Sequence, residues 1–283
     1  MRHRRLRRVR NRRAVLVIAV CAIAAAPLAA QAAQSPAPPA AAPPSPLSTA
    51  VVALGLRDPS LDAGVVRGGE VVLARGFEVE LARTLARRLG GRVSRFVYVP
   101  SQARLLASSG GDWQLALGGI DPSRGARAGA DLSVPYLTTD VAVVARRGLE
   151  RPRRLADLRA SLLCAVRGGD GARAMPVVRP RQQPVLVTGT ERLRTMLRTG
   201  ACDAALVPAV EAGRFVQGQR GSFGPVVGRI PRGKGLVIAV PRGAGLDVAA
   251  VDRELVRLRR DGTLGRLAKA WLGLDPESVR ILR

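Results

Sequence analysis

Charged side chains follow several apolar segments of this chain, at positions where they could bind a small molecule. Asp121 and Arg124 come after the segment 115–119, and Glu211 comes after the segment 204–207. A guanidinium pairs with a carboxylate through two parallel hydrogen bonds, whereas a carboxylate attracts a cation or caps a turn. Because ligands bind at the carboxyl ends of parallel strands, two such sheets facing one another would form a cleft from these loops.

Most other kinds of site are excluded by the residue types. The single histidine, His3, lies in the N-terminal segment, so no metal site is visible and no cofactor is expected. The glycine-rich turn at 168–171 is not followed by Lys-Ser or Lys-Thr, which excludes a nucleotide phosphate loop. General acid–base chemistry would depend on Glu211 or Asp121, the only candidate acids or bases in these loops. The sequence therefore favours binding over catalysis.

The N-terminal segment has the organisation of an export signal. Residues 1–13 carry eight arginines, residues 14–30 form an uncharged apolar run, and Ala30-Gln31-Ala32 offers the small residues that signal peptidase requires. The apolar run is too short for a membrane anchor. Residues 33–48 are rich in proline and alanine, which predicts a disordered spacer. We therefore expect a signal peptide at 1–32 and a mature protein in the periplasm.

The chain is strongly basic, with a formal net charge of +25. Subtracting the eight arginines of the export signal leaves +17 for the exported part. Such a balance is typical of nucleic-acid binding, but the positive charge is nearly all arginine, is scattered along the chain, and has few aromatic residues beside it for base stacking. We therefore expect no nucleic-acid partner, while attraction to an anionic ligand stays open.

The elements that must position these loops alternate between strands and helices. Residues 51–56 and 93–99 predict strands, and the apolar stripe of residues 77–89 predicts a helix between them. Thr188–Glu191 predicts a capping box at the start of another helix. Asp247 predicts the N-cap of a third helix near the C-terminus. Such alternation is typical of an α/β protein.

Two cysteines remain after export. Cys164 lies inside the apolar run 161–166, and Cys202 comes just before the apolar run 204–207. Both runs predict strands of one parallel sheet, in an oxidising compartment. Two alternatives stay open, a disulfide between them or two separately buried thiols.

Motifs near both ends of the exported part are similar to those of a known family. The heptapeptide Gly76-Phe77-Glu78-Val79-Glu80-Leu81-Ala82 begins the first helix, and Lys234–Arg242, Asp261–Gly265 and Lys269–Gly273 follow one another at the C-terminal end. In this order they resemble the first signature and the closing segment of the family 3 extracellular solute-binding proteins, the receptors of polar amino acid uptake systems. The resemblance spans residues 49–283.

This resemblance implies the fold, the organisation and the function. The expected fold class is α/β, a two-lobed periplasmic-binding-protein type II fold with two crossing strands between the lobes. Lobe one would comprise residues 49–143 and 236–283, and lobe two residues 144–235. The expected protein is a monomer that captures a small polar or anionic, amino-acid-like solute by lobe closure and delivers it to the permease of an ABC transporter.

The resemblance also implies where a ligand binds. In members that bind amino acids an arginine holds the ligand carboxylate, and Arg124 and Arg127 flank that position here. The usual aspartate for the ligand ammonium is replaced by Pro208, and Glu211 lies about one helical turn further on. The candidate ligand-binding residues are Ser101, Gly119, Asp121, Arg124, Arg127, Gly169, Asp170, Gly171 and Glu211.

Relatives of this fold also have two other functions. Some are dehydratases that act on carboxylated rings, which would here need Glu211 or Asp121 as an acid or base. Others are accessory proteins to a periplasmic quinoprotein dehydrogenase, in which case the basic surface would dock a protein rather than attract a ligand. Both alternatives stay open at the level of sequence.

Overall fold

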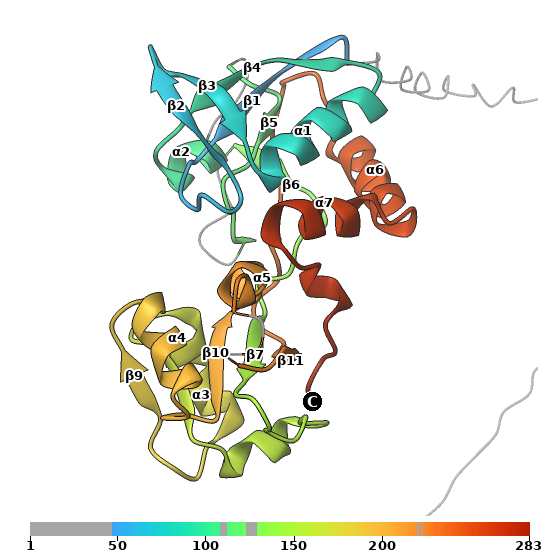
Figure 1. Cartoon of the computed structure of the whole chain (residues 1–283). Coiled ribbons are helices and arrows are strands. Elements are labelled where there is room, and N and C mark those ends of the chain that lie inside the picture. The colour runs from blue at the N-terminus through green and yellow to red at the C-terminus, as the bar shows by residue number, and fades with distance from the viewer. Residues whose placement is uncertain (1–46, 108–111, 123–128, 220, 222) are drawn as a thin grey trace, which may run out of the picture. The chain divides into compact units, whose positions relative to one another are not determined.

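The computed structural model describes residues 47–107, 112–122, 129–219, 221 and 223–283. The chain divides into two compact units, residues 1–42 and 43–283, and every described element belongs to the second unit. The predicted signal peptide at 1–32 and most of the predicted spacer at 33–48 lie outside the described residues. Within the second unit the strands form two sheets (Figure 1). In the described ranges no helix is both long and apolar enough to cross a membrane.

The first lobe is built on a seven-stranded sheet. Its strands are β1 (Thr49–Leu54), β2 (Ala63–Arg67), β3 (Glu70–Arg75), β4 (Arg92–Tyr98), β5 (Leu115–Ala116), β6 (Ala130–Leu132) and β12 (Ala239–Pro241). Their order is β2-β3-β4-β1-β5-β12-β6. β1 is parallel to β4 and β5, and the other pairs are antiparallel. The central strand is apolar because helices or loops cover both of its faces, so Val52 and Leu54 are completely buried.

Helices cover this sheet and form its core. The helices of the first lobe are α1 (Phe77–Arg88), α2 (Gln102–Ala107), α6 (Val248–Arg260) and α7 (Thr263–Leu272). Figure 1 shows α1, α6 and α7 side by side, and their apolar stripes meet in one cluster that includes Phe77, Leu81 and Leu258. The predicted cap is confirmed, because Asp247 accepts a hydrogen bond from the Ala249 amide at 2.9 Å.

The second lobe is built on a five-stranded sheet with the order β11-β7-β10-β8-β9. Its elements are β7 (Val141–Ala145), η2 (Leu155–Ala160), β8 (Leu163–Val166), α3 (Asp170–Val178), β9 (Val185–Val187), α4 (Thr190–Arg198), β10 (Ala204–Pro208), α5 (Ala209–Val216) and β11 (Val226–Ile230). β8 is parallel to β9 and β10, whereas β7 is antiparallel to β10 and β11. The predicted capping box is wrong: α4 begins after Gly189 without a side-chain cap, and Glu191 pairs with Arg194 instead.

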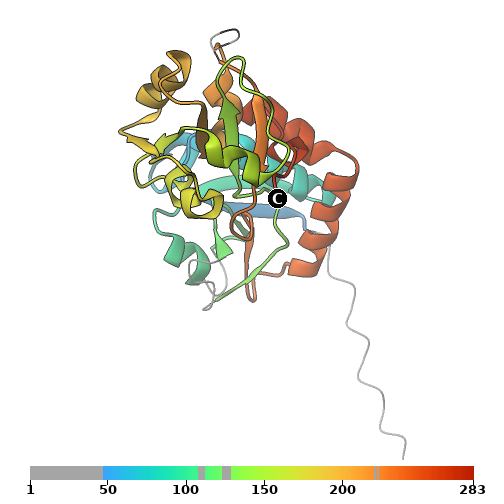
Figure 2. The same ribbon diagram turned by 90° about the horizontal axis from the view of Figure 1, so that it is seen from below.

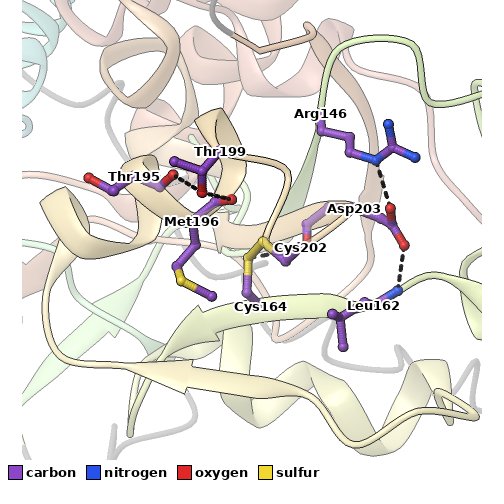
Figure 3. The surroundings of a disulfide bond; sticks show 9 residues. Arg146, Leu162, Cys164, Thr195, Met196, Thr199, Cys202 and Asp203 are labelled. Atoms are coloured by element: carbon purple, nitrogen blue, oxygen red, sulfur yellow. Dashed lines mark hydrogen bonds and ion pairs between the residues drawn. A yellow bond between two sulfur atoms is a disulfide. The ribbon is translucent and has the colours of Figure 1, made fainter.

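A disulfide joins Cys164 and Cys202 inside the second lobe, with 6.1 Å between their Cα atoms (Figure 3). Cys164 lies in β8, and Cys202 lies between α4 and β10. The next residue, Asp203, accepts hydrogen bonds from the Arg146 side chain at 2.7 Å and from the Leu162 amide at 2.8 Å (Figure 3). The start of β10 is therefore tied to β8 by a covalent bond and by a carboxylate.

Two segments of chain cross between the lobes. The first leads from β6 to β7, the second leads from β11 to β12, and Leu137 forms an antiparallel bridge with Leu236 where they pass. A lobe boundary was predicted between residues 143 and 144, whereas the whole of β7 pairs within the second sheet. After α7 and η3 (Pro276–Ser278), the tail returns to the second sheet (Figure 2), so part of the segment 236–283 packs on lobe two: Ile281 bridges Arg229 and Leu282 is buried.

Candidate functional site

A cleft of about 440 Å³ is lined by residues from both lobes and from the crossing segments. Its volume is within the usual range for small-molecule sites. The first lobe contributes the loop after β1, the start of α2 and the loop after β5. The second lobe contributes the first turns of α3 and α5. The lining residues are Arg57, Asp58, Leu61, Gln102, Gly118, Gly119, Asp121, Thr139, Asp140, Asp170, Arg173, Pro208, Ala209, Val210, Glu211, Arg232, Gly233 and Leu236.

The first-lobe loops meet because β1 and β5 are parallel neighbours whose carboxyl ends lie at the same sheet edge. There the backbones of Gly55 and Gly118 come into contact. Gly118 has φ +133°, and a Cβ atom on it would lie 2.6 Å from the Gly55 nitrogen. Only glycine fits this approach, which sets the position of Gly119 in the cleft wall.

Hydrogen bonds brace the first-lobe wall. The Arg57 guanidinium donates to the Gln102 side-chain oxygen at 3.1 Å, and the Gln102 amide donates to the Asp121 carbonyl at 3.1 Å. The Asp58 carboxylate accepts from the Ser60 amide at 2.8 Å. These bonds join three separate loops, so the charges of Arg57 and Asp58 are presented by a fixed surface.

The second-lobe wall carries a carboxylate without a partner. Asp170 pairs with Arg173 at 2.5 Å, and the Arg232 side chain donates to the Arg173 carbonyl at 2.8 Å. Glu211, in the first turn of α5, has no hydrogen bond or ion pair among the described residues. Burial raises the pKa of Glu211, and the nearby carboxylates of Asp58 and Asp170 raise it further.

A buried ion pair fixes the floor of the cleft where the two segments cross. Asp140 is 5% exposed and pairs with Arg229. Its other oxygen accepts from the Arg232 amide at 2.9 Å, and its carbonyl accepts from the Ala209 amide at 2.9 Å. One aspartate thus links both crossing segments to the start of α5.

The structure brings together four of the predicted site residues. Gly119, Asp121, Asp170 and Glu211 line the cleft. Arg124 and Arg127 lie outside the described residues.

Three other predicted site residues do not line the cleft. Ser101 precedes α2, where its carbonyl accepts from the Leu105 amide, and Gly169 caps α3. A Cβ atom on Gly171 would lie 2.0 Å from the Leu206 carbonyl oxygen, so this glycine allows α3 to approach β10. Asp170 already places a negative charge in the first turn of α3, which disfavours an anion there.

Several lining residues were not among the predicted site residues. Arg57 and Asp58 belong to a loop that the strand pattern does indicate. Asp140 and Arg232 lie on the crossing segments, and Arg173 lies one turn inside α3. Their only signal in the sequence is that they flank predicted crossing strands or follow a predicted loop. This signal does not identify them as lining residues, because tertiary packing decides which side of each segment faces the cleft.

Solved structures of similar fold include solute receptors and a related enzyme. The L-cystine solute receptor of Neisseria gonorrhoeae, in its unliganded open conformation, is 21% identical over 81% of this chain and 94% of its own, with a TM-score of 0.65. A polar amino acid ABC uptake transporter substrate-binding protein from Streptococcus thermophilus is 16% identical over 80% and 87%, with a TM-score of 0.61. An ancestral cyclohexadienyl dehydratase is 18% identical over 80% and 93%, with a TM-score of 0.58.

These identities are low, so the likeness establishes the fold alone, and it confirms the predicted two-lobed type II fold. The match of the sequence to a family model goes beyond the fold. The family model for bacterial extracellular solute-binding proteins, family 3, matches residues 70–274, which is most of the chain and covers parts of both lobes. This chain therefore belongs to the family 3 bacterial extracellular solute-binding proteins.

Proposed function

We propose that this protein is exported to the periplasm, captures a small amino-acid-like solute between its two lobes, and delivers it to the permease of an ABC transporter. The observation that carries this proposal is the cleft, which has room for a small molecule and is lined by both lobes. A solute that contacts both walls stabilises the closed arrangement, because it makes contacts there that separated lobes cannot offer. The predicted export signal and the family's extracellular role support the location.

The charges of the cleft favour a solute that carries both signs. Among the described residues, five acidic residues and three arginines line it, and Asp140 is neutralised by Arg229 outside the lining. The carboxylates of Asp58 and Asp170 act on Glu211, and no cation of the described residues forms an ion pair with it. A ligand ammonium near Glu211 would relieve this repulsion. Glu211 would then take the role of the aspartate that pairs with the ligand ammonium in amino-acid-binding relatives, at the position that Pro208 occupies here. The ligand carboxylate would meet arginines such as Arg57.

A stability screen tests the proposal. A ligand that binds only the folded protein raises its melting temperature by mass action. We expect at least one zwitterionic amino acid to raise the melting temperature in a panel of amino acids, organic acids and polyamines. A response to organic acids alone would contradict the predicted role of Glu211, and no response to any compound would contradict solute capture.

Glu211→Gln tests the ammonium position directly. The substitution keeps the size of the side chain and removes its charge, so the affinity for the amino acid found in the screen should fall by about tenfold or more. Glu191→Gln is the matched control, because Glu191 is an 85% exposed glutamate on another helix of the same lobe. Equal affinities in the two variants would place the ammonium elsewhere.

A dehydratase is the second candidate function. It is favoured by the raised pKa of Glu211, which suits a general acid in a cleft, and by the fold likeness to an ancestral cyclohexadienyl dehydratase. Turnover of a carboxylated cyclohexadienyl alcohol, lost in Glu211→Gln and retained in Glu191→Gln, would support this candidate. No turnover by the unmodified protein would exclude it for that substrate class.

A further inference from the structure

A completely buried glutamate lies directly behind the cleft wall. Glu78 is in the first turn of α1, and one of its carboxylate oxygens accepts hydrogen bonds from the Gly119 amide at 2.9 Å and from the Tyr136 hydroxyl. Gly119 lines the cleft, and Tyr136 immediately precedes the bridge between the crossing segments. A single carboxyl group therefore connects the first helix to a cleft loop and to the hinge.

A second buried acid holds the neighbouring loop. Asp62 is 2% exposed, and one of its oxygens accepts from the Leu56 amide at 2.9 Å. Leu56 has φ +47°, a left-handed conformation that costs energy for a leucine, so the bond to Asp62 helps to maintain it. The next two residues, Arg57 and Asp58, line the cleft. Asp62 thus fixes the backbone that presents both charges.

Among the groups that act on these two acids in the described residues there is no cation. One oxygen of Asp62 and one oxygen of Glu78 are buried without a hydrogen-bond partner among the described residues. The ionisable groups that act on Glu78 are Asp62, Asp58 and Tyr136, and none of them is a cation. The other acids nearby on helices are already paired, Glu80 with Arg83 and Glu254 with Arg257. Two bare carboxylates in this position would be costly, so one of them must hold a proton.

We propose that Glu78 is a positioning residue for the cleft: it shares a single proton with Asp62 at neutral pH, and this proton keeps the Gly119 and Leu56 loops in the arrangement that binds solute. The inference rests on the proposed function, because its consequence is a change in solute affinity. Loss of the proton leaves both carboxylates charged behind the wall. The resulting repulsion loosens both loops, so proton binding and solute binding become linked.

The protonation state agrees with this arrangement. Burial raises the pKa of Glu78 to about 8, and the charge of Asp62 contributes to the increase. Burial and the neighbouring carboxylate also raise the pKa of Tyr136, which keeps its phenol protonated as a donor. The hydrogen bond from Tyr136 acts in the opposite direction on Glu78, because it stabilises the ionised form.

An NMR titration without ligand tests the shared proton. The Gly119 amide of nitrogen-15-labelled protein should shift between pH 6 and 10 with a midpoint near 8, because it donates to Glu78. Glu78→Gln should abolish this titration, and Tyr136→Phe should raise its midpoint. Glu254→Gln is the matched control, a buried glutamate of the same lobe with its own arginine, and should leave the titration unchanged. A Gly119 shift that is flat, or that persists in Glu78→Gln, overturns the shared proton.

A binding measurement then tests the link to the cleft. Calorimetry with L-arginine, L-glutamine and L-cystine is performed at pH 7 and pH 9 on the unmodified protein and on Glu78→Gln. The affinity of the unmodified protein should fall about fivefold more than that of the variant, since titration of the ligand amine affects both equally. Equal losses overturn the link. If none of the three probes binds either protein, the proposed function fails for them, while the Gly119 titration still decides the shared proton.

Discussion

The buried acids behind the cleft are kept by different means in the two lobes. At the edge of the second lobe, Asp140 is buried against Arg229, and the same lobe is closed by the disulfide between Cys164 and Cys202. In the first lobe, Asp62 and Glu78 are buried together with no cation among the groups that act on them. An arginine stays charged at all ordinary pH values, whereas a proton is lost as the pH rises.

Because of this difference, we expect the stability of the two lobes to respond to different conditions. The stability of the first lobe should depend on pH, because its buried acids Asp62 and Glu78 are compensated by a proton rather than by an arginine. The stability of the second lobe should depend instead on its arginine and on oxidising conditions. Both lobes line the cleft, so a loss of stability in either lobe should change the binding site.

The pH dependence of the first lobe is expected to have the largest effect. The pKa of Glu78 rises from its ordinary 4.5 to about 8, so between these values the folded chain holds a proton that the unfolded chain lacks. The free energy of unfolding therefore falls as the pH rises across this window, by up to about 5 kcal/mol, and levels off above it. Urea unfolding at pH 5 to 9 measures this slope.

Glu78→Gln is the variant that sharpens this measurement. It should flatten the slope without abolishing it, because burial also raises the pKa of Asp62. Glu254→Gln should keep the slope of the unmodified protein, since Glu254 is paired with Arg257. A free energy of unfolding that has the same slope in all three proteins would show that Glu78 is not the protonated group.

Asp140→Ala should be the next largest change. It leaves the half-buried Arg229 without its carboxylate and removes the acceptor of the Arg232 amide, so we expect a loss of about 3–5 kcal/mol. Urea unfolding at a fixed pH of 7 checks this value. A loss below about 1 kcal/mol would mean that water reaches Arg229 and that the pair is not the anchor of the crossing segments.

Removal of the disulfide by the double substitution Cys164→Ala and Cys202→Ala should cost about 2–4 kcal/mol. The bond closes a loop between residues 38 positions apart. Without it the unfolded chain has a higher conformational entropy, which lowers the free energy of unfolding. The loss should equal that caused by a reducing agent on the unmodified protein. It should also leave the Gly119 titration unchanged, and a change there would show that the two lobes are not independent.

The exposed pair of Arg242 and Asp131 should show the smallest effect. These side chains are 60% and 47% exposed and lie 2.9 Å apart in the first lobe. Water screens such a pair, so Asp131→Ala should cost less than about 1 kcal/mol in the same urea assay. The variant is the exposed counterpart of Asp140→Ala, and similar losses in the two would contradict the role that we assign to burial.

Much of the fold followed from local patterns in the sequence. The apolar stripe of α1, the Asp247 cap of α6 and the alternation of strands and helices depend only on residues close together in the chain. The capping box at Thr188 failed because Gly189, with φ +84°, starts α4 in its place. The edge hairpin of β2 and β3 was not predicted, since its exposed valines give no clear alternation.

The site was only partly predictable. Glu211 was identified by its distance from a predicted strand, and the resemblance carried by the sequence implied that Pro208 stands where the family usually has an aspartate. Only the tertiary structure decided that Asp58 and Asp170 face Glu211, and that Asp140 finds its arginine 89 residues away. The reason is physical: caps and apolar periodicity are local properties of the chain, whereas the pairing of charges depends on which distant segments the packing of the sheets brings together.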